Sequence, residues 1–276
     1  MKRFFALLVV ILGFASAGAA QQKDTLRVLA IGNSFSQDAV EQYLYELFDA
    51  AGIPVIIGNM YIGGCTLERH FNNSVTGKKD YAYRKITGGV KTNTAEMPLA
   101  AGLADEPWDC VSFQQASGVS GEYETYEPYL LALQAYVRRR VPATAAFMWH
   151  QTWAYASDAT HREFSRYGSD QMKMYQAIVD ASRRALHNHG FPVFIPSGTA
   201  IQNARASALG DTLTRDGYHL ETTYGRFTAA CTWFEAITGL NVTENPYRPD
   251  SVPEETAAIC RRAAHNACRK PFKVTK

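Results

Sequence analysis

The amino-acid sequence predicts an α/β fold in which a parallel sheet is covered by helices on both faces. Two observations support this prediction. Short apolar runs, bounded by charged residues, glycine or proline, recur along the chain and have the length of buried strands. Between several of these runs lie longer segments in which apolar residues recur every three or four positions, as in helices that bury one face. Such alternation is typical of a parallel sheet.

The elements are expected in the following order. Residues 26–31 form an apolar run that suits a buried strand. A helical pattern begins at Asp38 and continues through Phe48; Gly52 is expected to end this helix, and Pro54 to begin a second strand that runs to about Met60. Further strands are expected over 110–114, 144–150 and 192–195, and further helices over 126–140, 168–189, 222–238 and 253–269. Residues 65–107 and 151–167 are long and irregular, and we expect them to form loops that shape the substrate site.

The first twenty residues have the layout of a secretory signal peptide. Lys2 and Arg3 precede an apolar stretch over residues 4–14, and small residues follow. This stretch is too short to span a bilayer. We therefore expect residues 1–20 to be removed on export, which leaves residues 21–276 as one domain with no stable membrane insertion. The mature protein is expected in the periplasm or outside the cell.

The composition argues against several classes of partner. The chain has 28 basic and 26 acidic residues and a formal net charge of +2, so it carries no electrostatic footprint for nucleic acid. Its five cysteines match no zinc or haem spacing. We expect no metal and no organic cofactor. Of the cysteines, only Cys65 is expected beside the site proposed below.

Three side chains supply the parts of a serine hydrolase. Ser34 follows the first predicted strand, and Asp216 precedes His219 by three residues near the C-terminus. A serine hydroxyl needs a neighbouring base to take its proton, and a carboxylate must hold that imidazole in the correct tautomer. In a doubly wound sheet, ligands bind at the carboxyl ends of the strands, where Ser34 is expected. Alternatively, Ser34 or Ser36 only caps the following helix.

Hydrolysis also requires donors for the oxyanion of the tetrahedral intermediate. The backbone N–H of Ser34 would lie at a helix N-terminus and face this crevice. Gly63-Gly64 follows the second strand and Gln114-Gln115 ends the third, so both pairs are expected at the same edge. Glycine permits close approach of the backbone to a ligand, and a glutamine amide offers two donors. An ordinary turn and a polar strand end are the alternative interpretations.

These blocks resemble the SGNH hydrolase superfamily, also called GDSL-type esterases, and within it a domain family of uncharacterised function common in gut Bacteroidetes. The matching segments are Gly32-Asn33-Ser34-Phe35-Ser36, Gly63-Gly64 and Asp216-Gly217-Tyr218-His219. The resemblance implies a three-layer α/β/α sandwich, flavodoxin-like, with a five-stranded parallel sheet. It also implies that Ser34 is the nucleophile, His219 the base and Asp216 the residue that orients it.

Two departures from the family pattern affect the site. Asn33 stands where the family has aspartate, and the segment 113–117 replaces the usual Gly-x-Asn-Asp block. Some carbohydrate esterases of the superfamily similarly have glutamine there. We therefore expect the oxyanion hole to comprise Ser34, Gly64 and Gln114, with Gln115 as the alternative to Gln114. Further candidate substrate-binding residues are Asn33, Arg69, His70, Gln115, His150 and Trp153.

The sequence thus predicts an exported serine esterase that removes an acyl group, most simply acetyl, from a carbohydrate. The carbohydrate assignment follows from the resemblance, from export and from aromatic loop residues that could stack on sugar rings. Two alternatives remain open. A hydrolase or transferase of lipid or peptidoglycan acyl groups would use the same three residues, and a catalytically inactive carbohydrate-binding protein could retain them.

Overall fold

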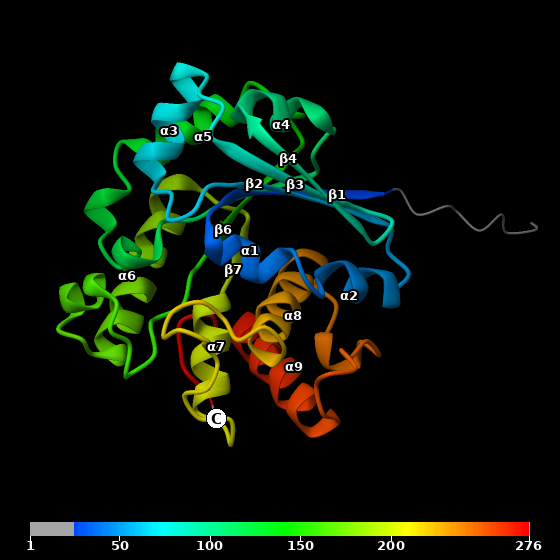
Figure 1. Ribbon diagram of the computed structural model, residues 1–276, viewed down its shortest axis with the longest axis vertical. Helices are drawn as coiled ribbons and strands as arrows, with labels where there is room; N and C mark the ends of the chain where they lie inside the picture. The colour runs from blue at the N-terminus through cyan, green and yellow to red at the C-terminus, as the bar shows by residue number, and fades with distance from the viewer. Residues whose placement is uncertain (1–24, 276) are drawn as a thin grey trace, which may run out of the picture.

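The computed structural model describes residues 25–275. The predicted signal peptide, residues 1–20, lies outside the described residues. Figure 1 shows a central sheet seen nearly edge-on, with α1, α2, α7, α8 and α9 below it and α3, α4 and α5 above it. The described residues thus form the expected three layers, helix, sheet and helix.

The sheet has seven strands rather than the five that the sequence predicts, in the order β4-β3-β2-β1-β5-β6-β7. Strands β2, β1, β5, β6 and β7 run parallel, whereas β3 pairs antiparallel with β2 and with β4. The strands are β1 Leu26–Gly32, β2 Val55–Tyr61, β3 Tyr81–Thr87, β4 Val90–Met97, β5 Cys110–Phe113, β6 Ala146–His150 and β7 Val193–Ile195. The predicted parallel strands are all present, so the correction concerns one added hairpin.

The hairpin lies in the segment 65–107, for which the sequence analysis predicts irregular loops. Gly88 and Gly89 form its two-residue turn, with φ of +57° and +76°. Positive φ at both positions is the geometry that matches the twist of two antiparallel strands. The Gly-Gly pair is therefore a sequence signal for a hairpin turn. Strand β4, however, is exposed along nearly its whole length and has no apolar pattern. A hydrophobicity pattern cannot detect such an edge strand.

The helices agree with the predicted order, except that one expected helix is divided and three further helices are present. The single helix expected between the first two strands is divided, because Tyr43 adopts a left-handed conformation with φ of 70°. Helices α3, α4 and α7 were not predicted. The helices are α1 Ser34–Val40, α2 Leu44–Ala50, α3 Leu67–Thr76, α4 Leu99–Asp105, α5 Tyr129–Arg138, α6 Gln171–His189, α7 Ser197–Arg205, α8 Tyr224–Thr238 and α9 Glu254–Arg269.

Strand β1 is buried on both faces, as expected for the centre of such a sheet. Val28 and Ala30 pack into the cluster formed with α1, α2, α8 and α9, while Leu29 and Ile31 pack into the cluster on the α3, α4 and α5 side. No helix among residues 25–275 is both long enough and apolar enough to cross a membrane. The carboxyl ends of the parallel strands meet at one edge, where the candidate site is formed.

Candidate active site

Ser34 is the first residue of α1, directly after β1. Its predecessor Asn33 caps the helix: Asn33 Oδ1 accepts a hydrogen bond of 3.0 Å from the Phe35 N–H. Among the described residues, the backbone N–H of Ser34 has no hydrogen-bond partner. The turn therefore places both a hydroxyl and a free N–H at the N-terminus of a helix, where developing negative charge is stabilised.

Ser36 is a buried structural residue. Its Oγ lies 2.8 Å from the Asn33 carbonyl oxygen and 2.9 Å from Asn59 Oδ1. Ser36 is fully buried, whereas Ser34 is partly exposed and lines a cavity. The structure thus separates the two serines that the sequence left as alternatives, and it places Ser34 where a substrate can reach it.

Asp216 and His219 lie beside each other in the loop that precedes α8. Asp216 Oδ2 is 2.6 Å from His219 Nδ1, and Asp216 Oδ1 accepts hydrogen bonds from the backbone N–H groups of His219 (2.7 Å) and Tyr218 (3.2 Å). A carboxylate can only accept, so Nδ1 carries the proton and Nε2 is left free to act as a base. Partial burial raises the pKa of Asp216, but the bonds from His219 and Tyr218 outweigh it and hold the pKa below its usual value.

A buried carboxylate on α1 holds this loop in place. Asp38 Oδ2 accepts a 2.8 Å hydrogen bond from the Leu220 N–H, and Asp38 forms ion pairs with Arg226 (2.6 Å) and Arg215 (3.2 Å). Both arginines flank His219 in the sequence. Because Asp38 lies one turn after Ser34 on α1, it ties the helix that begins at Ser34 to the loop that carries His219.

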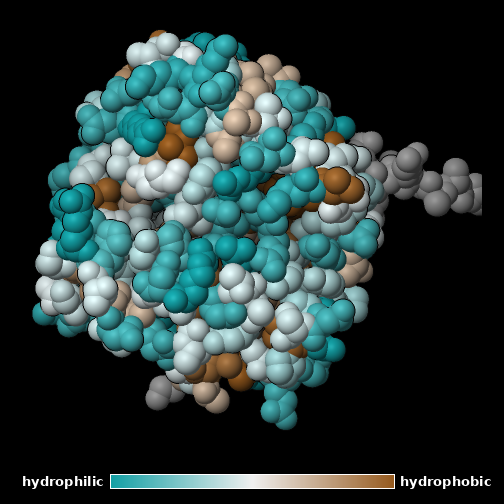
Figure 2. Space-filling model, in the orientation of Figure 1, coloured by the Kyte–Doolittle hydropathy of each residue, from teal (hydrophilic) through white to brown (hydrophobic). Residues whose placement is uncertain are grey.

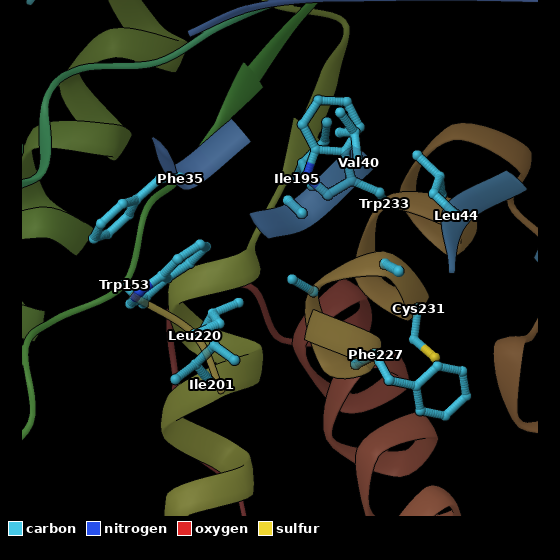
Figure 3. Packing of buried hydrophobic residues seen from close by; sticks show 14 of the residues in the cluster. Phe35, Val40, Leu44, Trp153, Ile195, Ile201, Leu220, Phe227, Cys231 and Trp233 are labelled. Carbon is cyan, nitrogen blue, oxygen red and sulfur yellow. The ribbon is translucent and has the colours of Figure 1, made fainter. Parts of the chain in front are cut away.

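An aromatic pair closes the space beneath the site. The rings of Phe35 and Trp153 stack with centroids 4.2 Å apart and an interplanar angle of 7° (Figure 3). Trp153 Nε1 donates a 2.8 Å hydrogen bond to the Tyr218 carbonyl oxygen, and the Phe35 ring also meets the His219 ring edge-on at 6.1 Å. The loop that bears the imidazole therefore rests on a rigid apolar floor.

Ser34 and His219 line one cavity of about 580 Å³. No hydrogen bond among the described residues joins Ser34 Oγ to His219; in unliganded hydrolases this contact is often long and tightens in the substrate complex. The cavity is lined by Ser34, Tyr61, Gly63, Gly64, Thr66, Ala116, Ser117, Gly118, Val119, Tyr155, His161, Arg162, Glu163, Arg166, Tyr218 and His219. This volume accommodates a small ligand.

Of the residues expected to form an oxyanion hole, Gly64 lies at the cavity and Gln114 does not. Gly64 lines the cavity in a left-handed conformation with φ of +60°, and its N–H has no partner among the described residues, as expected. Gln114, by contrast, is 1% exposed and does not line the cavity. Its Nε2 donates 2.8 Å to Asn33 Oδ1, and its Oε1 lies 2.9 Å from His150 Nδ1. The expected role of Gln114 as a donor at the cavity is therefore corrected, because its amide is bonded within the interior.

The other candidate substrate-binding residues also lie away from the cavity. Asn33, Gln115, His150 and Trp153 are at most 2% exposed and are bonded to protein groups. Gln115 Oε1 accepts from the Leu67 and Ala116 N–H groups, so it supports the start of α3.

The two candidates on α3 likewise do not line the cavity. His70 is fully buried against the Tyr81 hydroxyl, and burial lowers the pKa of His70 to about 3. Arg69 pairs with Asp80 at 3.5 Å on the surface. These corrections share one cause: residues near a strand end or helix start can turn into the core as readily as into the crevice.

One wall of the cavity is formed by residues that no sequence motif indicates. Tyr155, His161, Arg162, Glu163 and Arg166 all lie between residues 151 and 167, the segment expected to shape the substrate site. The segment expected to form a loop near the site does line the cavity, but no spacing rule identifies which of its side chains face inward.

Cys65 does not act as a nucleophile in this arrangement. It is fully buried, and burial raises the pKa of its thiol to about 12. A thiol without thiolate character is unreactive at neutral pH. No group of three or more histidine, cysteine, aspartate or glutamate side chains within residues 25–275 is arranged to hold a metal ion.

A serine after the first strand of a layered α/β fold, with an Asp-x-x-His loop before a late helix, is the arrangement of an SGNH-like fold. The chain belongs to the family described as "Domain of unknown function (DUF4886)", whose model matches residues 27–267. A DUF4886 family protein from Bacteroides uniformis shares 56% sequence identity over 91% of this chain and 98% of its own, with a TM-score of 0.90. The resemblance stated from the sequence motifs is thereby confirmed.

More distant structures share the fold. Axe2, an acetylxylan esterase from Geobacillus stearothermophilus, is 13% identical, with a TM-score of 0.51 over 79% of this chain and 96% of its own. TesA is 11% identical, with a TM-score of 0.51 over 77% of this chain and 98% of its own. At these identities the likeness concerns the fold alone. A search of curated proteins gives no match.

Proposed function

We propose that this protein is an exported serine esterase that hydrolyses acetyl esters on a carbohydrate, acting in the periplasm or outside the cell. The observation that carries the proposal is the joint placement of Ser34, the Asp216–His219 pair and the free N–H groups of Ser34 and Gly64 around one cavity. An inactive binding protein has no need for a serine, an oriented base and unpaired N–H donors in the same place.

The geometry assigns each group a step. Ser34 Oγ attacks the ester carbonyl carbon while His219 Nε2 takes the hydroxyl proton, and Asp216 stabilises the imidazolium that forms. The oxyanion that forms accepts hydrogen bonds from the backbone N–H groups of Ser34 and Gly64. The intermediate collapses to acetyl-Ser34, and His219 gives its proton to the departing sugar oxygen. Water, deprotonated by His219, then attacks the acetyl carbonyl carbon. The bond from that carbon to Ser34 Oγ breaks, His219 returns the proton to Oγ, and acetate leaves.

The lining of the cavity favours a short acyl group. Ala116 and Val119 are the aliphatic side chains among the described lining residues, and the Phe35–Trp153 pair fills the space beneath Ser34. A long acyl chain needs an apolar channel, which these residues do not provide. The face of the molecule seen in Figure 2 is mostly hydrophilic, with hydrophobic residues scattered in small groups, so it offers no broad surface for lipid docking.

The wall of the cavity favours a sugar as the alcohol part of the ester. Tyr61 and Tyr218 are partly exposed and present rings with polar ends, and Arg162, Glu163 and Arg166 add charged donors and acceptors. Aromatic faces combined with planar polar groups suit a ring that has apolar C–H faces and hydroxyl edges. The fold likeness to Axe2, an acetylxylan esterase, points the same way.

The proposal is tested with p-nitrophenyl esters of increasing chain length and with acetylated xylo-oligosaccharides. We expect acetate release from the oligosaccharides, and kcat/KM for p-nitrophenyl butyrate to lie roughly tenfold or more below that for the acetate, because one poorly accommodated methylene is worth about 1–3 kcal/mol. Ser34→Ala serves as the inactive control.

Other outcomes would identify the alternatives. A preference for octanoyl over acetyl esters would favour a lipid hydrolase. Transfer of the acyl group to a glycan acceptor in place of water would indicate a transferase. Absence of hydrolysis with every ester, together with retained glycan binding, would support the inactive carbohydrate-binding protein.

A further inference from the structure

A chain of buried hydrogen bonds crosses the carboxyl ends of all five parallel strands, directly beneath the candidate site. It joins Ser197 after β7, His150 at the end of β6, Gln114 after β5, Asn33 after β1 and Cys65 after β2. Each of these residues is at most 2% exposed.

The hydrogen bonds of this chain are short and continuous. Ser197 Oγ lies 3.0 Å from His150 Nε2, His150 Nδ1 lies 2.9 Å from Gln114 Oε1, and Gln114 Nε2 lies 2.8 Å from Asn33 Oδ1. Asn33 Nδ2 then donates 3.0 Å to the Cys65 carbonyl oxygen. A Cβ at Gly32 would lie 3.0 Å from Gln114 Cδ and closer still to Ser36, so glycine before Asn33 leaves room for the amide.

Two backbone groups fix the direction of every bond. The Phe35 N–H can only donate and the Cys65 carbonyl can only accept, so Asn33 must present Oδ1 to Phe35 and Nδ2 to Cys65. Gln114 must then donate to Asn33 and accept from His150. His150 consequently carries its proton on Nδ1, and Nε2 accepts from the Ser197 hydroxyl. Burial lowers the pKa of His150 to about 3, which keeps this ring neutral.

The chain ends on the two turns that form the oxyanion hole. Asn33 immediately precedes Ser34, and the Cys65 peptide immediately follows Gly64. Among residues 25–275, Asn33 is therefore the side chain whose hydrogen bonds join both turns, and Gln114 and His150 hold its amide in orientation. We propose that His150 and Gln114 are positioning residues that set the separation of the Ser34 and Gly64 N–H groups. This inference rests on the proposed esterase mechanism, but it concerns residues that do not touch the substrate.

Two substitutions at His150 test this inference as a matched pair. Asparagine places an amide N–H near the position of Nδ1 and can keep the bond to Gln114, whereas glutamine reaches the position of Nε2 and keeps only the bond to Ser197. We expect His150→Asn to stay within about threefold of wild-type kcat and His150→Gln to lose about 10- to 100-fold, because displacing a catalytic group by about 1 Å can cost that much. KM and the thermal midpoint should be similar in the two variants.

The rate at which a fluorophosphonate modifies Ser34, followed by peptide mass spectrometry, gives a readout that does not need ester turnover. The inference predicts that His150→Asn retains this rate and His150→Gln loses it. His150→Leu, which removes both polar contacts, replaces His150→Gln if that variant does not fold, and it should show the same loss.

The outcomes separate this inference from the proposed function. Equal labelling rates in both variants, or losses that follow thermal stability alone, would overturn the positioning role. If the wild type is labelled at Ser34 but releases no acetate, the proposed function fails, while the ratio of labelling rates still decides the inference. A wild type that is not labelled at Ser34 would overturn both.

Discussion

Ser34→Ala is expected to lower kcat for ester hydrolysis by about 10³-fold or more, and His219→Ala by a comparable factor, because each removes one member of a unit that acts together. The double variant should be little worse than either single one. Ser34 is partly exposed at the cavity and belongs to neither hydrophobic core cluster, so Ser34→Ala should leave the thermal midpoint nearly unchanged. His219→Ala also removes the ring contacts with Asp216 and Phe35, so a modest fall in its thermal midpoint is expected. Steady-state kinetics and thermal unfolding of the three variants check this prediction.

The neighbouring serine supplies the control. Ser36→Ala removes a buried hydroxyl that contacts Asn33 and Asn59, so it should lower the free energy of unfolding by about 1–3 kcal/mol while leaving the nucleophile in place. Near-complete loss of activity in Ser36→Ala with full activity in Ser34→Ala would show that the nucleophile has been misassigned.

Asp38→Ala is expected to cause the largest loss of stability at the site, about 3–5 kcal/mol, because it leaves Arg226 and the Leu220 N–H without their buried partner. The same change should lower kcat, since the loop that carries His219 is no longer tied to α1. Denaturant unfolding gives the stability, and ester hydrolysis under conditions where the variant remains folded gives kcat.

Asp38→Asn separates the charge from the hydrogen bond. The amide oxygen can still accept from Leu220, while the ion pairs with Arg215 and Arg226 are lost. We expect an intermediate loss in both measurements. Unchanged kcat in folded Asp38→Ala would contradict the role of Asp38 in positioning His219.

The five parallel strands could be predicted because each is an apolar run with clear boundaries. Strand β4 could not, since its exposed polar residues carry no hydrophobic signal. Helix α7 was missed for a different reason: all of its residues from Ser197 to Arg205 are buried although five of the nine are polar, so its sequence does not show which residues face the core. Hydrophobic periodicity detects elements with one buried side, and these two elements lie outside that class.

The part of the candidate site that depends on residues close together in the sequence could be predicted. Asp216 and His219 meet because three residues in a tight loop bring them together. The role expected of Gln114 depended instead on which way its amide turns, and that is decided by Asn33 and His150, which come from distant parts of the chain. In the same way, which side chains line the cavity wall is decided by how residues 155–166 fold over the site, and no local pattern in the sequence gives this.

The central claim is that Ser34 carries the acyl group during turnover. The most direct measurement is acid quenching of the protein during the reaction with p-nitrophenyl acetate, followed by peptide mass spectrometry. The account predicts one acetyl group on the peptide that contains Ser34, assigned to Ser34 by fragmentation and absent from Ser34→Ala. An acetyl group on Ser36 or on another residue in its place, or steady acetate release by Ser34→Ala, would contradict it.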